Sequence, residues 1–125
     1  MQVVFSKKAT LSVGQTISSS IQLDGQLVGI VLPAGITGTV LKVQVLHPDG
    51  ATWLEIHEDD IDAGGMIGAY NYVTTTLPVI STLRGAGMNA IDGESVPIPF
   101  NATIRFVASV AQATSPVDIY TIVRQ

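Results

Sequence analysis

The sequence predicts an all-β protein folded as a single β-sandwich. Val, Ile and Thr make up 40 of the 125 residues, and these β-branched side chains fit a pleated sheet better than a helix. Apolar and polar residues alternate with a period of two in several short segments spaced about ten residues apart, as is typical of sandwiches. Long connections alternate with tight hairpins, which favours a jelly-roll topology. We expect a domain over residues 13–125, preceded by an N-terminal arm or edge strand over residues 1–12.

The first well-patterned segments lie between residues 17 and 32. In residues 17–23 the odd-numbered positions are expected on one face of a strand and the even-numbered positions on the other. Asp24-Gly25 then marks a turn. The continuous apolar run over residues 27–32 predicts a strand that is buried on both faces.

A hairpin is expected next. Residues 40–46 alternate, and His47-Pro48-Asp49-Gly50 predicts a tight turn, because Pro fixes φ, Asp caps the turn and Gly accepts a positive φ. The partner strand is expected over residues 52–57, with Trp53 and Glu55 on the same face.

The second half of the chain is less regular at first and ends in two clear strands. Further strands are expected at residues 70–76, 79–83, 103–110 and 117–123. A short helix or 3₁₀ turn is an alternative near residues 77–84, and residues 112–116 are expected to form a turn. The side chains expected in the core are Leu27, Ile30, Val43, Val45, Ile104 and Phe106.

The charge content excludes several classes of function. Charged residues are 13% of the chain and the net charge is −4, so there is neither a basic stripe for nucleic acid nor a polybasic patch for a membrane surface. The longest apolar run, residues 27–34, is too short to span a bilayer. The N-terminal sequence lacks the pattern of a signal peptide, so we expect synthesis in the cytoplasm. A surface with so few charges separates monomers poorly, which indicates a protein that works in an assembly.

No motif fixes a catalytic chemistry or a cofactor. Gly-x-Ser-x-Gly and phosphate-binding glycine motifs are absent, and so is Cys. We therefore expect a protein that is not an enzyme, with no catalytic residue, no cofactor and no metal. Half of the acidic residues cluster at Glu55, Glu58, Asp59, Asp60 and Asp62; a solvated loop is the favoured interpretation and a Ca²⁺ site the alternative.

Two further groups of side chains are candidate sites. His47 and His57 flank the expected hairpin and would hold Zn²⁺ only with a third ligand, so we expect surface histidines. A set of aromatic residues could form a platform for carbohydrate. These are Phe5, Trp53, Tyr70, Tyr72, Phe100, Phe106 and Tyr120.

One stretch of the chain resembles a family. It reads Gln26-Leu27-Val28-Gly29-Ile30-Val31-Leu32-Pro33-Ala34, then Val40-Leu41-Lys42-Val43-Gln44-Val45, then Asp49-Gly50-Ala51-Thr52-Trp53-Leu54-Glu55-Ile56. This order resembles small virion proteins of tailed bacteriophages, in which an apolar-Gly-Ile-apolar-Pro strand precedes an Asp-Gly-x-Thr-aromatic hairpin. The likeness covers residues 16–57, with a weaker echo in residues 100–109 and the last strand.

The resemblance implies a capsid decoration (cement) protein on the outer face of a phage head. Its expected partners are the major capsid protein and further copies of itself, as a homodimer or homotrimer, with no nucleic acid and no membrane. Alternatives are another virion module, in a tail, baseplate or fibre, and a non-catalytic carbohydrate-binding sandwich. Val3, Val4 and Phe5 are the candidate subunit or capsid contacts, because they are apolar and precede the first well-patterned strand.

Overall fold

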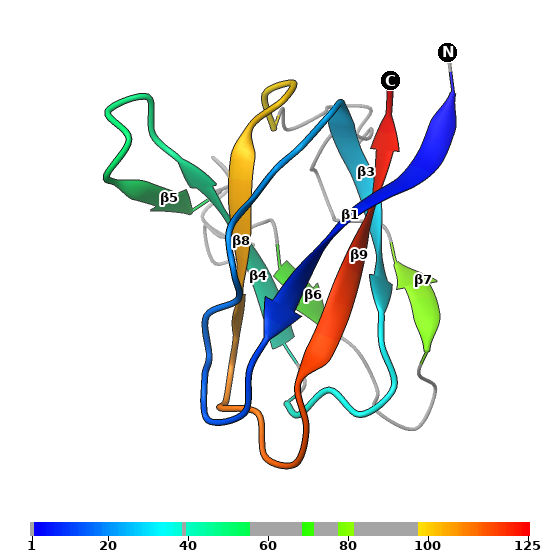
Figure 1. The fold of residues 1–125 in the computed structure, drawn as a ribbon, viewed down its shortest axis with the longest axis vertical. Coiled ribbons are helices and arrows are strands. Elements are labelled where there is room, and N and C mark those ends of the chain that lie inside the picture. The colour runs from blue at the N-terminus through cyan, green and yellow to red at the C-terminus, as the bar shows by residue number, and fades with distance from the viewer. Residues whose placement is uncertain (1, 39, 56–68, 72–77, 82–97) are drawn as a thin grey trace, which may run out of the picture.

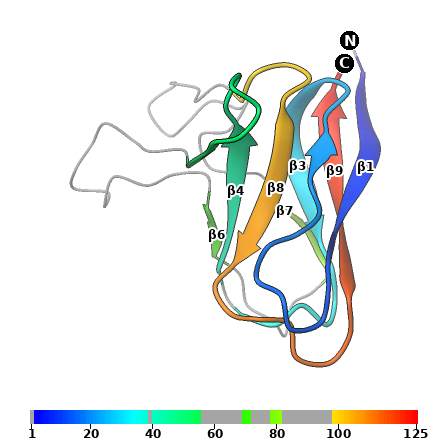
Figure 2. The same ribbon diagram turned by 60° about the vertical axis from the view of Figure 1, so that its left-hand side comes forward.

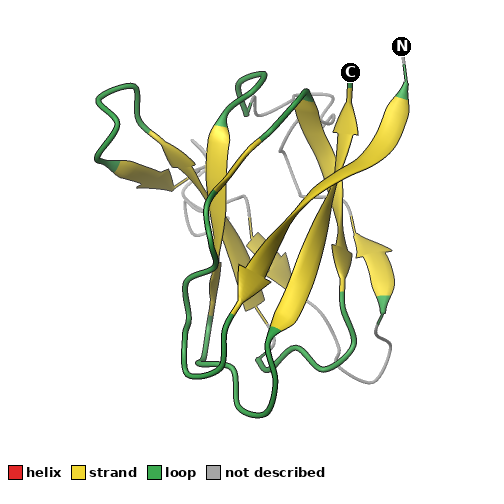
Figure 3. Cartoon of the chain, in the orientation of Figure 1, coloured by secondary structure: helices red, strands yellow, loops and turns green. Residues whose placement is uncertain are grey.

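A computed structural model describes residues 2–38, 40–55, 69–71, 78–81 and 98–125 of the chain. Within these residues the secondary structure is entirely β, with strands joined by loops and turns (Figure 3). No described segment forms a helix that is long and apolar enough to cross a membrane. The prediction of an all-β sandwich is therefore confirmed at the level of class.

The strands form two antiparallel sheets, which face each other as two layers (Figures 1 and 2). The first sheet has the order β1 (Val3–Leu11), β9 (Val117–Arg124), β3 (Gln26–Leu32) and β7 (Val79–Ser81). The second sheet has the order β2 (Ile21–Gln22), β8 (Thr103–Ala108), β4 (Val40–Leu46) and β5 (Trp53–Glu55). A further strand of the second sheet, β6 (Ala69–Asn71), pairs with the first half of β4, next to the segment that pairs with β5.

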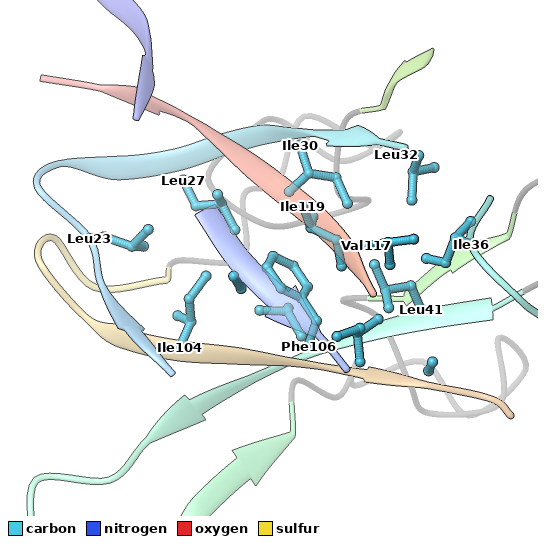
Figure 4. Packing of buried hydrophobic residues seen from close by; sticks show 14 of the residues in the cluster. Leu23, Leu27, Ile30, Leu32, Ile36, Leu41, Ile104, Phe106, Val117 and Ile119 are labelled. Carbon is cyan, nitrogen blue, oxygen red and sulfur yellow. The ribbon is translucent and has the colours of Figure 1, made fainter. Parts of the chain in front are cut away.

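The core lies between the two sheets and is built from alternate residues of the long strands. Phe106 of β8 is completely buried, and its ring lies among side chains of both sheets (Figure 4). Five of the six residues expected in the core are buried there, namely Leu27, Ile30, Val43, Ile104 and Phe106. The sixth, Val45, is only partly buried, because it lies near the end of β4 and lines a surface groove described below.

The hairpin turn predicted at residues 47–50 is present. The Gly50 N–H donates to the carbonyl of His47 at 2.9 Å, and Gly50 has a φ of 77°. Asp49 Oδ1 accepts hydrogen bonds from the N–H groups of Ala51 and Thr52, at 2.8 and 2.9 Å, and its Oδ2 accepts one from the Thr52 hydroxyl. These bonds lower the pKa of Asp49 to about 2, because they favour its charged form.

The strand predicted at residues 17–23 is wrong in extent and in facing. Only β2 forms a strand there, and Ile17 makes an isolated bridge to Val107 and is largely exposed. Ser18, expected on the polar face, is buried instead. Its N–H donates to the carbonyl of Phe106 at 2.9 Å and its Oγ accepts the Phe106 N–H at 2.8 Å. Ser18 is buried here because its N–H and its Oγ bond to the C=O and the N–H of Phe106, so none of these polar groups is left unpaired.

The remaining predicted strands can be compared with the structure only where their residues are described. β8 and β9 lie where strands were expected, with Ile104, Phe106 and Ala108 facing the core. Pro78 is a bend and residues 79–81 form a strand, so the helical alternative is wrong for these four, and residues 77 and 82–84 lie outside the described part. Only the described portions of the strands expected at 52–57 and 70–76, β5 and β6, can be compared.

One end of the sandwich is held by a buried glutamine in the segment expected to be a plain turn. Gln112 is 2% exposed. Its side-chain Oε1 accepts the Thr37 N–H at 2.8 Å, and its Nε2 donates to the Thr37 carbonyl at 3.1 Å. Its backbone N–H and carbonyl bond to Gln15 and Gly14. Gln112 thus connects three loops and leaves none of its polar groups unpaired.

Candidate interaction surface

The outward side of the first sheet is unusually apolar. We call the side chains Val3, Phe5, Val31, Ile80, Tyr120 and Ile122 the apolar outer face. The register joins five of them into two rows, Phe5 beside Ile122, and Tyr120 beside Val31 beside Ile80. Val3 precedes Phe5 on the same side of β1 and lies opposite Arg124. Phe5 is 66% exposed, Ile80 63%, Val3 58% and Tyr120 42%. Val31 is partly buried and Ile122 is only 9% exposed. Exposed apolar side chains gathered on one face of a sheet, here from β1, β7 and β9, are typical of an interaction site.

This face exists because β9 is apolar on both sides. Ile119, Thr121 and Val123 point into the core and are fully buried. Tyr120 and Ile122 therefore point outward, since successive residues of a strand face opposite ways. The sequence predicts a strand at residues 117–123, but Tyr120 and Ile122 were not among the predicted contacts. The signal was available, because a strand with one solvated face normally carries polar residues there.

Polar groups border the apolar outer face at the far end of β1. Lys8 Nζ lies 3.2 Å from Asp118 Oδ2 and 6.0 Å from the centre of the Tyr120 ring. The Thr10 hydroxyl donates to Asp118 Oδ1 at 2.7 Å. The bonds from Thr10 and Lys8 lower the pKa of Asp118, and the bond to Asp118 raises the pKa of Lys8. The charges of Lys8 and Asp118 are thus paired with each other beside the apolar outer face.

The three residues predicted as contacts are divided between the two sides of β1. Val3 and Phe5 lie on the apolar outer face, whereas Val4 is partly buried and packs against the core. β1 pairs with β9 from Val3 opposite Arg124 to Leu11 opposite Val117, with a β-bulge between Phe5 and Lys8. Of the two expectations for residues 1–12, the structure thus has Val3–Leu11 as an edge strand of its own sheet, and Figure 2 shows β1 at its rim.

The outward side of the second sheet is polar and forms a chain of contacts across three strands. The guanidinium of Arg105 stacks on the Trp53 ring at 4.2 Å, and its Nε donates to Gln44 Oε1 at 2.7 Å. Gln44 Nε2 donates to Glu55 Oε1 at 3.3 Å, and Lys42 Nζ lies 3.5 Å from the same oxygen. We call these five side chains the polar outer face. Trp53 and Glu55 share a face, as predicted.

A groove of about 390 Å³ lies beside the β4–β5 hairpin. Its lining is mostly apolar and consists of Val45, Leu46, Pro48, Leu54, Glu55, Pro99 and Ala102. Leu54 is exposed and is the partner of Val45 in the hairpin register. The groove explains why Val45 is less buried than expected.

The metal-site alternatives can be compared with the described residues only in part. His47 is exposed; its Nδ1 accepts the Asp49 N–H at 3.0 Å and lies 3.5 Å from Asp49 Oδ2. Across the described residues, no three His, Asp or Glu side chains gather in a way that could hold a metal ion. His57 and the acidic residues at 58–62 lie outside the described part, as does Tyr72.

The aromatic side chains that the structure describes do not gather into one platform, and Tyr70 and Tyr72 are outside this comparison. Phe106 is in the core, Phe5 and Tyr120 are on the apolar outer face, and Trp53 is on the opposite side of the molecule. Phe100 is 59% exposed and lies in the turn before β8. Comparison of the chain with protein-family models, curated protein sequences and solved structures finds no match.

Proposed function

We propose that this chain is a structural virion protein that decorates the outer surface of a tailed-phage capsid as a cement protein. The apolar outer face is the observation that carries the proposal. It is displayed by a four-stranded sheet packed on the core, so it presents a rigid surface to a partner. It combines Phe5, Tyr120 and Ile80, large side chains whose burial against a capsid subunit would release apolar area from water.

The proposed mechanism is adhesion without chemistry. A decorator that binds only the assembled shell stabilises that shell by mass action, by about 2.7 kcal/mol per site when its free concentration is a hundred times the dissociation constant. The partners are the major capsid protein and other copies of this chain, and no nucleic acid, membrane or cofactor is involved. The chain is made in the host cytoplasm and ends on the capsid surface.

We also propose that the topology is a jelly roll. The strand orders β1-β9-β3-β7 and β2-β8-β4-β5 support it, because every neighbouring pair except β4–β5 joins strands that are far apart in the chain. This is the order expected when a long hairpin, closed at β4–β5, is wrapped around a core. Jelly rolls are found in viral capsid and lectin domains. That analogy concerns the fold and adds less to the functional argument than the surface does.

The polar outer face favours a second candidate, a non-catalytic carbohydrate-binding module. Trp53 offers an aromatic ring, and Arg105, Gln44 and Glu55 offer planar hydrogen-bonding groups beside it. One face of the ring is covered by Arg105, and the polar groups already bond to one another. Sugar binding would have to replace these contacts, which makes this the weaker candidate.

Co-sedimentation with purified shells tests the proposal. We expect the chain to bind expanded shells of the capsid protein encoded in the same genome. Phe5→Ser should weaken binding at least tenfold, whereas Phe100→Ser, the same change at a Phe of similar exposure away from the apolar outer face, should not. Equal binding by both variants would contradict the assigned surface. Binding to purified tails or to immobilised glycans, but not to shells, would favour the alternatives.

A further inference from the structure

The open edge of β1 has an unusual division between free and occupied backbone groups. The Gln125 N–H donates to the carbonyl of Gln2 at 2.9 Å, so these opposite residues are a hydrogen-bonded pair. Such pairs alternate with non-hydrogen-bonded pairs along an antiparallel ladder. Val4 opposite Val123 is then the next hydrogen-bonded pair, and the N–H and C=O groups of Val3 and Phe5 point away from β9.

The second half of the same edge is occupied. A β-bulge between Phe5 and Lys8 shifts the alternation, so that Thr10 turns its backbone groups to the open side. There the Ser19 N–H donates to the Thr10 carbonyl at 3.0 Å and Ser19 Oγ accepts the Thr10 N–H at 2.9 Å. The same bonding confirms the alternation deduced from Gln2.

Two side chains of the bulge itself are also tied to the neighbouring segment. The Ser6 hydroxyl donates to Asp24 Oδ1, and Lys7 Nζ donates to the carbonyl of Gln22 at 2.8 Å. From Ser6 onward, the edge is therefore covered by residues 19–24. Within the described part of the chain, no group bonds to the outward N–H and C=O of Val3 and Phe5. Exposed edge groups of this kind are templates for another strand.

We propose that two copies of this chain pair through Val3–Phe5 of β1, antiparallel and around a two-fold axis at Val4. Val3 of one copy then lies opposite Phe5 of the second copy, and the reverse holds by symmetry. The four free groups of each copy are thereby matched by hydrogen bonds across the axis, and the two first sheets join into one. This inference does not depend on the proposed role in the virion.

A second copy fits this edge for three reasons. The free segment, Val3–Phe5, is only three residues long. When two copies pair antiparallel through it, the covered residues from Ser6 onward extend beyond Val3–Phe5 of the other copy and do not obstruct the pairing. Gln2 to Ser6 carries no charged side chain, so the pairing opposes no like charges. The pairing sets Val3 beside Phe5 of the other copy on the outward side, a favourable β-branched–aromatic contact that continues the apolar outer face across the axis.

A proline substitution tests the pairing between copies without disturbing the pairing of β1 with β9. Val3→Pro removes an N–H that points to the open edge and leaves the ladder to β9 intact, and proline is tolerated on edge strands. Val3→Ala removes the side chain but keeps the N–H. By sedimentation at roughly 200 µM, where a micromolar Kd gives nearly complete dimer, we expect dimer for the wild type and Val3→Ala and monomer for Val3→Pro.

Several results would overturn the inference. These are a wild-type monomer or trimer at that concentration, or a dimer that survives Val3→Pro but is lost in Tyr120→Ser, which would indicate packing through the sheet face. If Val3→Pro fails to fold, amide exchange of the wild type decides. Val3 and Phe5 should exchange at least tenfold more slowly in concentrated than in dilute protein, whereas Val4 should be protected in both; no dependence on concentration refutes the pairing.

Discussion

Phe106 is the side chain whose removal tests the packing of the sandwich most severely. It is fully buried in β8, opposite Val43 of β4, and lies under side chains of the first sheet such as Leu27 and Ile119 (Figure 4). Phe106→Ala deletes the whole ring. The strands around it are held by antiparallel ladders in both sheets, so the walls of the resulting cavity cannot close over it.

The expected cost follows from the burial. Replacing a buried Phe by Ala destabilises by about 3–5 kcal/mol, which includes the lost transfer free energy and the cavity left behind. We expect a value in the upper part of this range, because the site lies between two sheets. A loss of this size is a large part of the free energy of about 5–15 kcal/mol by which a domain is stable. Divided by an ordinary m-value for urea, the loss lowers the urea midpoint by roughly 2 M.

Urea denaturation followed by β-type circular dichroism and by the single Trp provides the assay. Phe100→Ala is the matched control, because it makes the same chemical change at a residue that is 59% exposed, and surface changes usually stay within about 0.5 kcal/mol. A loss below roughly 1 kcal/mol for Phe106→Ala, or equal losses for both variants, would refute the packing described here.

Two further predictions concern polar groups. Ser18→Ala leaves the N–H of Phe106 without its bond to Oγ and should cost about 1–3 kcal/mol in urea denaturation, whereas Ser20→Ala, at an exposed position nearby, should be nearly neutral; equal effects would contradict the role of Ser18. Because hydrogen bonds lower the pKa of Asp49 from 3.8 to about 2, its ionised form stabilises the turn above pH 3.8 and this contribution is lost as the pH falls toward 2. The melting temperature of the wild type should therefore fall more steeply over this range than that of Asp49→Asn, and parallel curves would contradict the argument.

The sequence predicts well those parts of the fold that depend on local patterns. Strand alternation places Ile104 and Phe106 in the core, and turn chemistry places Asp49 and Gly50. These signals act over a few residues, because side chains alternate with a period of two and turn types select particular residues. They also explain why the class of fold follows from composition and period alone.

The sequence fails to predict burial where a polar side chain forms hydrogen bonds with the backbone of a distant segment. Ser18 and Gln112 are buried because each bonds to the backbone of a residue far away in the sequence, Phe106 and Thr37. Nothing local distinguishes them from exposed polar residues such as Ser20. Their burial follows only from the arrangement of the strands, which a single sequence does not reveal.

The candidate surface was predicted only in part, for a related reason. The sequence predicts Val3 and Phe5 as contacts because they are apolar and near the N-terminus, and the structure sets them on the same sheet face as Tyr120, Ile122, Val31 and Ile80. That juxtaposition requires the order of strands β1-β9-β3-β7. Val4 was grouped with its neighbours, but its side chain lies on the core side, as alternation requires.

Hydroxyl-radical footprinting of the shell-bound protein tests the central claim most directly. Aromatic side chains are readily oxidised where solvent reaches them, and this chain has reporters on both sides. If the apolar outer face binds the capsid, Phe5 and Tyr120 should become protected on binding, whereas Phe100 and Trp53 keep the labelling of the free protein. Protection of Trp53 and Phe100, with Phe5 and Tyr120 still labelled as in the free protein, would contradict the account.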